Sequence, residues 1–273
     1  MGVFNSVTGG FFDLLFFPFR GLSPWIGMAA VSVLTAFLML WIYKLTSNQD
    51  GIRRAKNAIK AHLLELRLFK DDLRVSFRAQ KRILRANARY LALNAKPLLV
   101  LIVPLVLILA QLNLRFGYSP LEPGGEAVVK IRLDRSTNPL DLAVSVTPSE
   151  GVAVETPAVR IPDLYEIVWR IKALRPGTAV LSFGAAGFVL DKTVSVSGKR
   201  LSVVSPRRPR GFLPALLYPG EKPLPSGPVK SIEVLYEPAK LSLLGMNIYW
   251  LVAYLVLSVV FGFGFKGVFK VEI

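Results

Sequence analysis

Residues that commonly carry out chemistry are sparse in this chain of 273 residues. It has no cysteine and one histidine, His62, which stands in a basic stretch with no triad or metal partner nearby in sequence. Without cysteine there can be no disulfide, thiolate metal site or cysteine nucleophile. We find no phosphate loop, paired-carboxylate motif or nucleophile elbow. The sequence therefore predicts a protein that is not an enzyme and has no cofactor.

Three uncharged apolar runs dominate the rest of the sequence: Trp25 to Tyr43, Pro97 to Leu114 and Leu243 to Phe265. Each has roughly 18–23 residues, close to the ~20 that a helix needs to cross the hydrocarbon core of a bilayer. Trp25, Tyr43 and Trp250 stand where an interfacial aromatic belt would place them. We therefore expect three transmembrane helices.

Polar side chains inside these runs are costly in lipid, which makes them candidates for a functional site. A structural role stays open for each of them, because serine and threonine can bond to their own helix backbone and the amides near the end of the second run fit the membrane interface. The candidates are Ser32, Thr35, Gln111, Asn113, Asn247, Tyr254 and Ser258.

The charge of the chain sets the predicted orientation of these helices. The net charge is +16 although 52% of the residues are hydrophobic, and residues 44–96 alone hold fourteen Lys and Arg against four acids. Short basic loops stay in the cytoplasm. We therefore expect a multi-pass protein of a prokaryotic plasma (inner) membrane, with this segment and the C-terminus in the cytoplasm. The N-terminus and residues 115–242 would then lie outside.

The basic segment carries a helical pattern. From Ile52 to Leu91 apolar residues recur at spacings of three and four, a heptad-like repeat typical of a coiled coil. Asn48 or Asp50 can cap its start. Because both ends must return to the bilayer, we expect an antiparallel helical hairpin that turns near Lys70-Asp71-Asp72, where Asp can cap the second helix. Such a hairpin would bury the apolar stripe against itself. Its exposed basic face would comprise Arg53, Arg54, Lys56, Arg67, Arg74, Arg78, Lys81, Arg82, Arg85 and Arg89.

Three partners fit these cations, and the sequence leaves them open. One is the anionic headgroups of the bilayer, at about 1 kcal/mol per residue near the surface. The second is ribosomal RNA or another polyanion, although no aromatic residues that could stack on bases are interleaved with the cations. The third is a cytosolic partner or a nascent chain.

From Glu126 to Pro206 the pattern changes to period two, with turn signals between short apolar stretches. About seven short strands in roughly 80 residues indicate an immunoglobulin-like β-sandwich, with Trp169 in its core. Residues 206–228 are rich in proline and predict a stiff, unpacked connector. Ser231 to Tyr236 would add one more strand.

The predicted fold class is thus an α+β membrane protein. The segment Phe11 to Phe19 is too short to cross and predicts an amphipathic helix at the interface. In chain order, we expect an N-terminal interfacial segment (1–24), a first span (25–44), the basic hairpin (45–96), a second span (97–115), an external β domain (116–205), a connector (206–242), a third span (243–265) and a cytoplasmic tail (266–273).

This order resembles the YidC/Oxa membrane insertase superfamily, in particular its small three-span members. The resemblance is carried by Tyr43 to Gln49, by Ile59 to Phe69 and by the second span from Pro97, and it covers residues 11–115 and 243–265. It implies a groove open to cytoplasm and lipid and lined by the polar span residues named above. It further implies nascent or partner membrane proteins as clients, with the ribosome as a possible second partner. The competing hypothesis is a non-catalytic subunit of a larger membrane complex that docks through the β domain.

Overall fold

The structure is a computed structural model that describes residues 2–19, 21–69, 72–185, 187–197, 201–243 and 245–272. The chain forms two compact units. The strand-rich unit comprises Met1–Gly27 and Val106–Trp250, and the helical unit comprises Met28–Leu105 and Leu251–Ile273.

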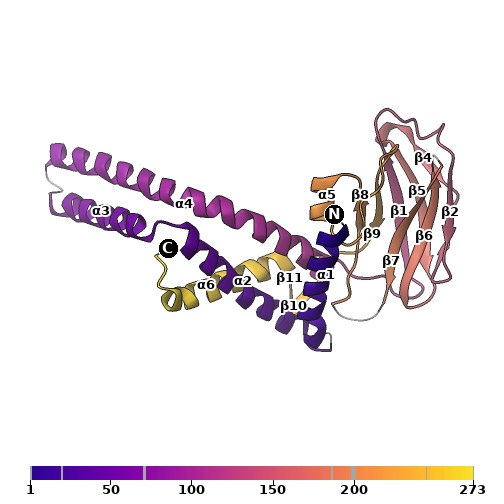
Figure 1. Ribbon diagram of the computed structural model, residues 1–273, viewed down its shortest axis with the longest axis horizontal. Coiled ribbons are helices and arrows are strands. Elements are labelled where there is room, and N and C mark those ends of the chain that lie inside the picture. Colours follow the sequence, from indigo (N-terminus) through magenta and orange to yellow (C-terminus); the bar gives the residue numbers. More distant parts are fainter. Residues whose placement is uncertain are drawn as a thin grey trace. The chain divides into compact units, whose positions relative to one another are not determined.

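Two antiparallel sheets make up most of the strand-rich unit (Figure 1). The larger has the strand order β3-β5-β1-β9-β8, with β4 also paired to β5, and the smaller has the order β2-β6-β7. The strand bounds are β1 Glu126–Leu133, β2 Val144–Pro148, β3 Val152–Val154, β4 Val159–Ile161, β5 Glu166–Ala173, β6 Gly177–Ala185, β7 Phe188–Val196, β8 Arg207–Pro209 and β9 Val229–Leu235.

Side chains from both sheets form one hydrophobic core, because alternate residues of each strand point inward. Val129 and Ile131 of β1 and Leu181 of β6 are fully buried. Trp169 of β5 packs against Phe183 of β6 with ring centroids 5.4 Å apart. The predicted core position of Trp169 is confirmed, as are strands over most of the predicted stretches. Residues 201–204, expected to be the last of those strands, form no strand, and Val204 is buried with its N–H bonded to the carbonyl of Leu114.

The proline-rich segment was expected to be an unpacked connector, and this prediction is wrong. Its first residues form β8 on the edge of β9, and a short helix follows, α5 (Phe212–Leu217). Leu224 is part of the core, and the neighbouring Glu221 is bonded to β7. A few buried contacts are enough to pack the segment, although its composition is typical of an extended linker.

Helices flank the sheets in the strand-rich unit: α1 (Gly2–Phe16) and the short 3-10 helices η1 (Phe17–Phe19) and η2 (Pro162–Leu164). Phe12 and Phe16 of α1 are buried, and Phe16 contacts the ring of Phe116. The expected helix near the N-terminus is therefore present, and one of its faces is covered by protein.

In the described part of the chain, three helices are long and apolar enough to cross a membrane. They are α2 (Pro24–Thr46), α4 (Leu73–Phe116) and α6 (Trp250–Phe269). Two of their predicted limits need correction. Helix α4 does not break at Pro97 but continues through Pro97 and Pro104, as membrane helices can when neighbouring groups satisfy the freed carbonyl. The last helix begins at Trp250 and not at Leu243, because residues 241–248 form a β-hairpin of β10 (Leu241–Leu243) and β11 (Met246–Ile248).

The basic segment consists of α3 (Gln49–Leu68) and the first part of α4, which run beside each other in the helical unit (Figure 1). Asn48 caps α3 by accepting from the N–H of Gly51, at 2.8 Å. Asp72 caps α4 by accepting from the N–H groups of Arg74 and Val75. Both caps agree with the sequence prediction. The other two residues of the predicted turn, Lys70 and Asp71, lie outside the described residues.

The apolar stripe of this segment is buried only in part. Ile52 and Ala55 of α3 are buried, whereas Leu63 of α3 and Phe77 and Leu84 of α4 are exposed. The expectation that pairing would bury the whole stripe is therefore wrong. An ion pair contributes to holding the two helices together, with Arg82 Nη1 3.3 Å from Glu65 Oε1.

Candidate functional site

An apolar cavity of about 370 Å³ lies among α2, α4 and α6 in the helical unit. Leucine, methionine, valine and alanine side chains supply most of its lining residues. The lining residues that carry polar atoms in their side chains are Thr35 and Tyr43 of α2 and Tyr254 and Ser258 of α6. The cavity thus offers an apolar surface with a few fixed hydroxyl groups, the arrangement typical of sites that bind largely apolar ligands.

Helical spacing gathers these hydroxyl groups. Ser32 and Thr35 are three residues apart on α2, and Tyr254 and Ser258 are four apart on α6, so each pair shares a helix face. Ser32 and Tyr254 are 0% exposed and Thr35 is 4% exposed. The Tyr254 hydroxyl lies within interaction range of Thr35 and Ser258. Four of the seven predicted site residues therefore lie on the facing sides of two helices.

Three of these oxygens lack a partner. Among the described residues, the hydroxyls of Ser32, Tyr254 and Ser258 are buried and have no hydrogen bond of acceptable distance and angle. An unsatisfied buried hydroxyl costs about 1–3 kcal/mol by mutational measures. Such groups are rare in folded proteins and call for an explanation. A ligand that supplies the missing partners provides one.

Tyr43 closes one end of the cavity through a polar network. Its hydroxyl donates to Asn94 Oδ1 of α4 and approaches the carbonyl oxygen of Glu272 at 3.3 Å. The N–H of Glu272 donates to Gln49 Oε1 at 2.7 Å, and its carboxylate lies 3.4 Å from Lys56 Nζ. The end of the chain is thereby fastened to α2 and α3. The sequence pattern gave no sign of this network.

The remaining predicted site residues belong to the strand-rich unit. Asn247 is exposed in β11 and not inside a span. Asn113 lies within interaction range of Tyr118, whose pKa is raised mainly by burial. Gln111 is buried and accepts from Arg115 Nη1 at 3.1 Å. None of these three amides lines the cavity among α2, α4 and α6.

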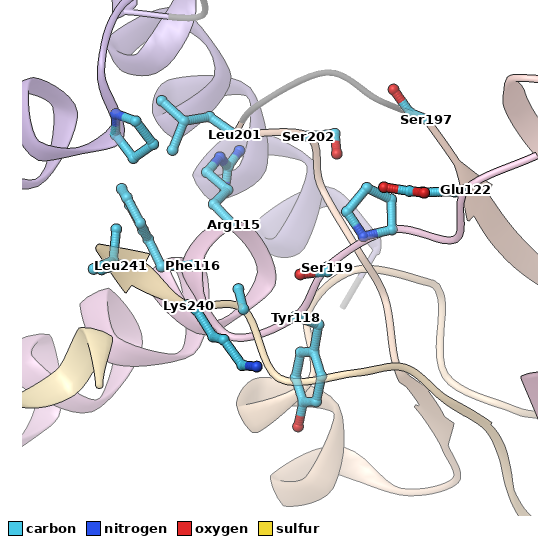
Figure 2. Close-up of a pocket in the computed structure, with 13 residues that line it drawn as sticks. Arg115, Phe116, Tyr118, Ser119, Glu122, Ser197, Leu201, Ser202, Lys240 and Leu241 are labelled. Atoms are coloured by element: carbon cyan, nitrogen blue, oxygen red, sulfur yellow. The ribbon is translucent and has the colours of Figure 1, made fainter. Parts of the chain in front are cut away.

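Arg115 forms a cluster that sequence reasoning missed. Its guanidinium lies 2.5 Å from Asp13 Oδ1 and over the rings of Phe12 and Phe16, and the side chain is 2% exposed. A pocket of about 250 Å³ borders it, with Ser202 and Lys240 on its wall (Figure 2). The carboxylate neutralises the arginine, so the cluster holds α1 against the end of α4. Asp13 and Arg115 are 102 residues apart, so no local pattern could reveal the pair.

A groove lined by cations runs between α3 and α4, with a volume of about 360 Å³. Its floor is formed by Ala55, Ala58 and Ala86. Its walls carry Arg54, His62, Arg82, Arg85 and Arg89. Six members of the predicted basic face do not line it, namely Arg53, Lys56, Arg67, Arg74, Arg78 and Lys81.

Glu65 is the acid nearest this groove. The hydrogen bond from His62 and the charge of Arg82 lower the pKa of Glu65 and outweigh its desolvation. The carboxylate is therefore ionised at neutral pH and offsets part of the positive charge beside it.

Comparison with known proteins adds no assignment. No family model, curated protein or solved structure matches the chain. The function must therefore be argued from the geometry.

In the part of the chain that the structure describes, no three His, Asp or Glu side chains converge into a group that could hold a metal ion. The buried ion pair of Lys192 and Glu221 in the strand-rich unit is 2.6 Å long and is enclosed by Ser205 and Thr193. Its groups are already satisfied by each other, which is typical of a structural pair.

Proposed function

We propose that the protein assists the integration of membrane proteins, as an insertase or chaperone of the YidC/Oxa kind. The observation that carries the proposal is the pair of buried, unpartnered hydroxyls of Tyr254 and Ser258 in an apolar cavity among three membrane-length helices. A polar segment that crosses lipid leaves its backbone groups unsatisfied, at several kcal/mol each. Hydroxyls held inside the membrane offer such groups temporary partners and so lower that cost.

Exposed apolar side chains of the same helices support the proposal. Leu99 and Val103 of α4 and Val256 and Val260 of α6 are more than half exposed in the protein alone. Surfaces of this kind mark contact with lipid or with another apolar segment. A client helix can leave the cavity along them into lipid, while its polar flank stays near Thr35, Tyr254 and Ser258.

In the proposed orientation α3 and the first part of α4 form a cytoplasmic helical hairpin, and the strand-rich unit lies outside as an immunoglobulin-like sandwich. The positive-inside bias of residues 44–96 supports this arrangement. The two antiparallel sheets around one core, with Trp169 inside, support the sandwich class. The N-terminus is then external and the C-terminus cytoplasmic.

The test is integration into proteoliposomes that contain the full-length protein. The client has one apolar span and a short polar N-terminal tail, and protection of that tail from added protease measures insertion. In the variant Thr35→Val/Tyr254→Phe/Ser258→Ala we expect insertion to fall at least severalfold. Thr46→Val is the control, because Thr46 does not line the cavity and donates to the carbonyl of Ile42 within its own helix.

A second client with the same span but no polar tail should insert equally well with all variants. If the triple variant inserts the polar client as fast as the parent protein, the hydroxyls play no part and the proposal fails. Equal thermal stability of the variants in detergent excludes misfolding as the cause of a loss.

An accessory subunit of a larger complex is the second candidate. The observation in its favour is an open apolar hollow of about 700 Å³ beside β2, β6 and β7, where Phe188 and Val189 are exposed. Native purification discriminates the two functions. A stable stoichiometric assembly that Val189→Asp disrupts supports the subunit, whereas transient capture of many nascent chains supports the insertase.

A further inference from the structure

The β-hairpin of β10 and β11 has one polar and one apolar face. Cross-strand partners lie on the same face of a hairpin, and successive residues of a strand alternate between the faces. Ser242 lies opposite Asn247, and both are exposed. The other face carries two apolar pairs, Leu241 with Ile248 and Leu243 with Met246. The hairpin is therefore amphipathic, in a stretch where the sequence predicts the start of a transmembrane helix.

Protein covers this apolar face only at its base. Leu241 is 5% exposed, whereas Leu243 is 40% and Met246 is 62% exposed. Tyr249, which follows the hairpin, is also more than half exposed. Within the described ranges, β10 and β11 pair with no further strand. A two-stranded hairpin is marginally stable in water unless another surface covers its apolar face, so the exposed tip requires a partner.

The hairpin is fastened to one end of each membrane-length helix. The indole of Trp25, in the first turn of α2, donates to the carbonyl of Ser242 at 2.8 Å. The N–H of Ala239, just before β10, donates to the carbonyl of Gly117, the residue that follows α4. Only Tyr249 separates β11 from α6. The hairpin therefore lies beside the start of α2, the end of α4 and the start of α6.

These three helix ends lie on the same side of a bilayer that the helices cross, because successive spans run in opposite directions. The hairpin is thereby held at the level of the membrane surface, in either orientation of the chain. Each strand has three residues. At ~3.3 Å per residue the hairpin is about 10 Å long, comparable with the headgroup layer of about 5–8 Å on each side. Its unpaired strand edges can reach water in this layer, which the hydrocarbon core would not allow.

We propose that the apolar face of the β10–β11 hairpin inserts into the lipid at the membrane surface, with Leu243 and Met246 among the first acyl carbons and Asn247 toward water. Amphipathic elements of this kind bury their apolar face about 5–10 Å into the boundary between headgroups and acyl chains. Tyr249 has the amphipathic ring typical of that layer. The hairpin thereby anchors the strand-rich unit to the bilayer. The proposal requires only that the three helices cross the membrane, and it does not depend on the insertion of clients.

Depth-dependent fluorescence quenching tests this position. The chain has no cysteine, so Met246→Cys provides a single site for an environment-sensitive NBD label. The full-length protein is reconstituted into phosphatidylcholine vesicles in which some lipids carry a nitroxide, either near the headgroup or near the end of the acyl chain. Leu140→Cys is the control for water, because Leu140 is apolar, 59% exposed and lies in the loop between β1 and β2. Val260→Cys, at an exposed position of α6, is the control for the membrane interior.

We expect the nitroxide near the headgroup to quench the label at position 246 at least about twofold more than the label at position 140, because the proposed depth is about 5–10 Å. The nitroxide near the chain end should quench the label at position 246 less, and the label at position 260 more. Iodide added to the aqueous phase should quench the label at position 140 most strongly.

A matched pair of substitutions, each combined with the label at position 246, tests whether the apolar face drives insertion. Leu243→Asp places a charge on the apolar face and should move the label toward water, with less quenching by lipid nitroxides and more by iodide. Asn247→Asp places the same charge on the polar face and should leave the quenching unchanged. Circular dichroism verifies that both variants are folded.

Three outcomes overturn the proposal. Iodide quenching at position 246 as strong as at position 140 would place the hairpin in water. Protection of the label from both iodide and lipid nitroxides would show that protein covers the tip, either a second copy of the chain or another partner. Equal effects of Leu243→Asp and Asn247→Asp would show that the apolar face does not drive insertion. Because the assay uses no client, its failure leaves the insertion test unaffected.

Discussion

One set of buried polar groups in each unit differs in how it is partnered, although the strand-rich unit also has buried side-chain atoms without a described hydrogen-bond partner, in Asn5, Ser202 and Trp250. In the strand-rich unit the fully buried Lys192 is bonded to Glu221 and to the carbonyl of Ser205, both at 2.6 Å. In the helical unit the buried hydroxyls of Ser32, Tyr254 and Ser258 have no partner among the described residues. A buried charge without a partner would unfold a domain, whereas an orphaned hydroxyl is tolerable if a ligand gains from it. The contrast therefore separates groups that hold the fold from groups available for binding.

The first prediction removes one charge from the buried ion pair of Lys192 and Glu221 in the strand-rich unit. Glu221→Gln leaves the Lys192 ammonium buried without a counter-charge, so the free energy of unfolding of the strand-rich unit should fall by about 3–5 kcal/mol. The chain has four tryptophans. Replacing Trp25, Trp41 and Trp250 with Phe leaves Trp169 in the core as the only reporter. Urea unfolding of the full chain, followed by Trp169 fluorescence, measures the loss.

The matched variant for this prediction is the double replacement Lys192→Met/Glu221→Gln, which removes both charges. It should be more stable than Glu221→Gln alone, because an apolar side chain does not require a counter-charge. If the two variants unfold at the same urea concentration, the ion pair does not govern the stability of this unit.

The second prediction follows from the pKa of Lys192. Burial lowers this pKa from its ordinary 10.5, and the charge of Glu221 opposes the effect only in part. Between the folded pKa and 10.5 the unfolded chain binds more protons, so stability should rise with pH in that interval. The gain is about 1.4 kcal/mol for each unit of displacement. Above about pH 10 the trend reverses, because burial raises the pKa of Tyr236 and the unfolded tyrosine ionises first.

Urea unfolding at a series of alkaline pH values tests this dependence. Lys192→Met should abolish the rise in stability, whereas Lys222→Met, which alters an exposed lysine nearby, should leave it intact. A rise that survives Lys192→Met would assign the pH dependence to other groups.

The sequence predicted those parts of the molecule that depend on local pattern. The length of the apolar runs predicted three membrane-length helices, and the alternation of apolar residues predicted most of the strands. The side-chain chemistry of helix caps predicted the roles of Asn48 and Asp72. The continuity of α4 through Pro97 was missed because membrane helices tolerate proline where polar groups or a local backbone adjustment satisfy the freed carbonyl. The hairpin at residues 241–248 was missed because its residues are as apolar as the helix that follows.

At the candidate site, too, local sequence pattern accounts for some of the neighbours and not for others. Spacing along one helix is enough to place Ser32 beside Thr35 and Tyr254 beside Ser258. It could not show that Gln111 bonds Arg115, whose own partner Asp13 is 102 residues away in sequence. Which side chains pair across such separations depends on the tertiary fold, and it cannot be predicted from composition or from the spacing of apolar residues.

The last prediction compares a hydrogen-bonded and an unbonded tyrosine hydroxyl within the helical unit, through two matched Tyr→Phe changes. Tyr43 donates to Asn94 and approaches the carbonyl of Glu272, so Tyr43→Phe leaves those acceptors unsatisfied and should cost about 1 kcal/mol. Tyr254→Phe removes a hydroxyl that has no bond to lose, so stability should stay within about 0.5 kcal/mol of the parent or increase. Thermal unfolding of the full chain in detergent, followed by far-UV circular dichroism, ranks the two variants.

The same pair separates stability from function. Tyr254→Phe should be the more stable variant and yet insert the polar-tailed client more slowly than the parent, because the lost hydroxyl acts on the client and not on the fold. A destabilised Tyr254→Phe would mean that this hydroxyl bonds within the protein, through Thr35 or Ser258 or an enclosed water. It would then belong with the satisfied groups of the strand-rich unit, and the cavity would lose the property on which its proposed role depends.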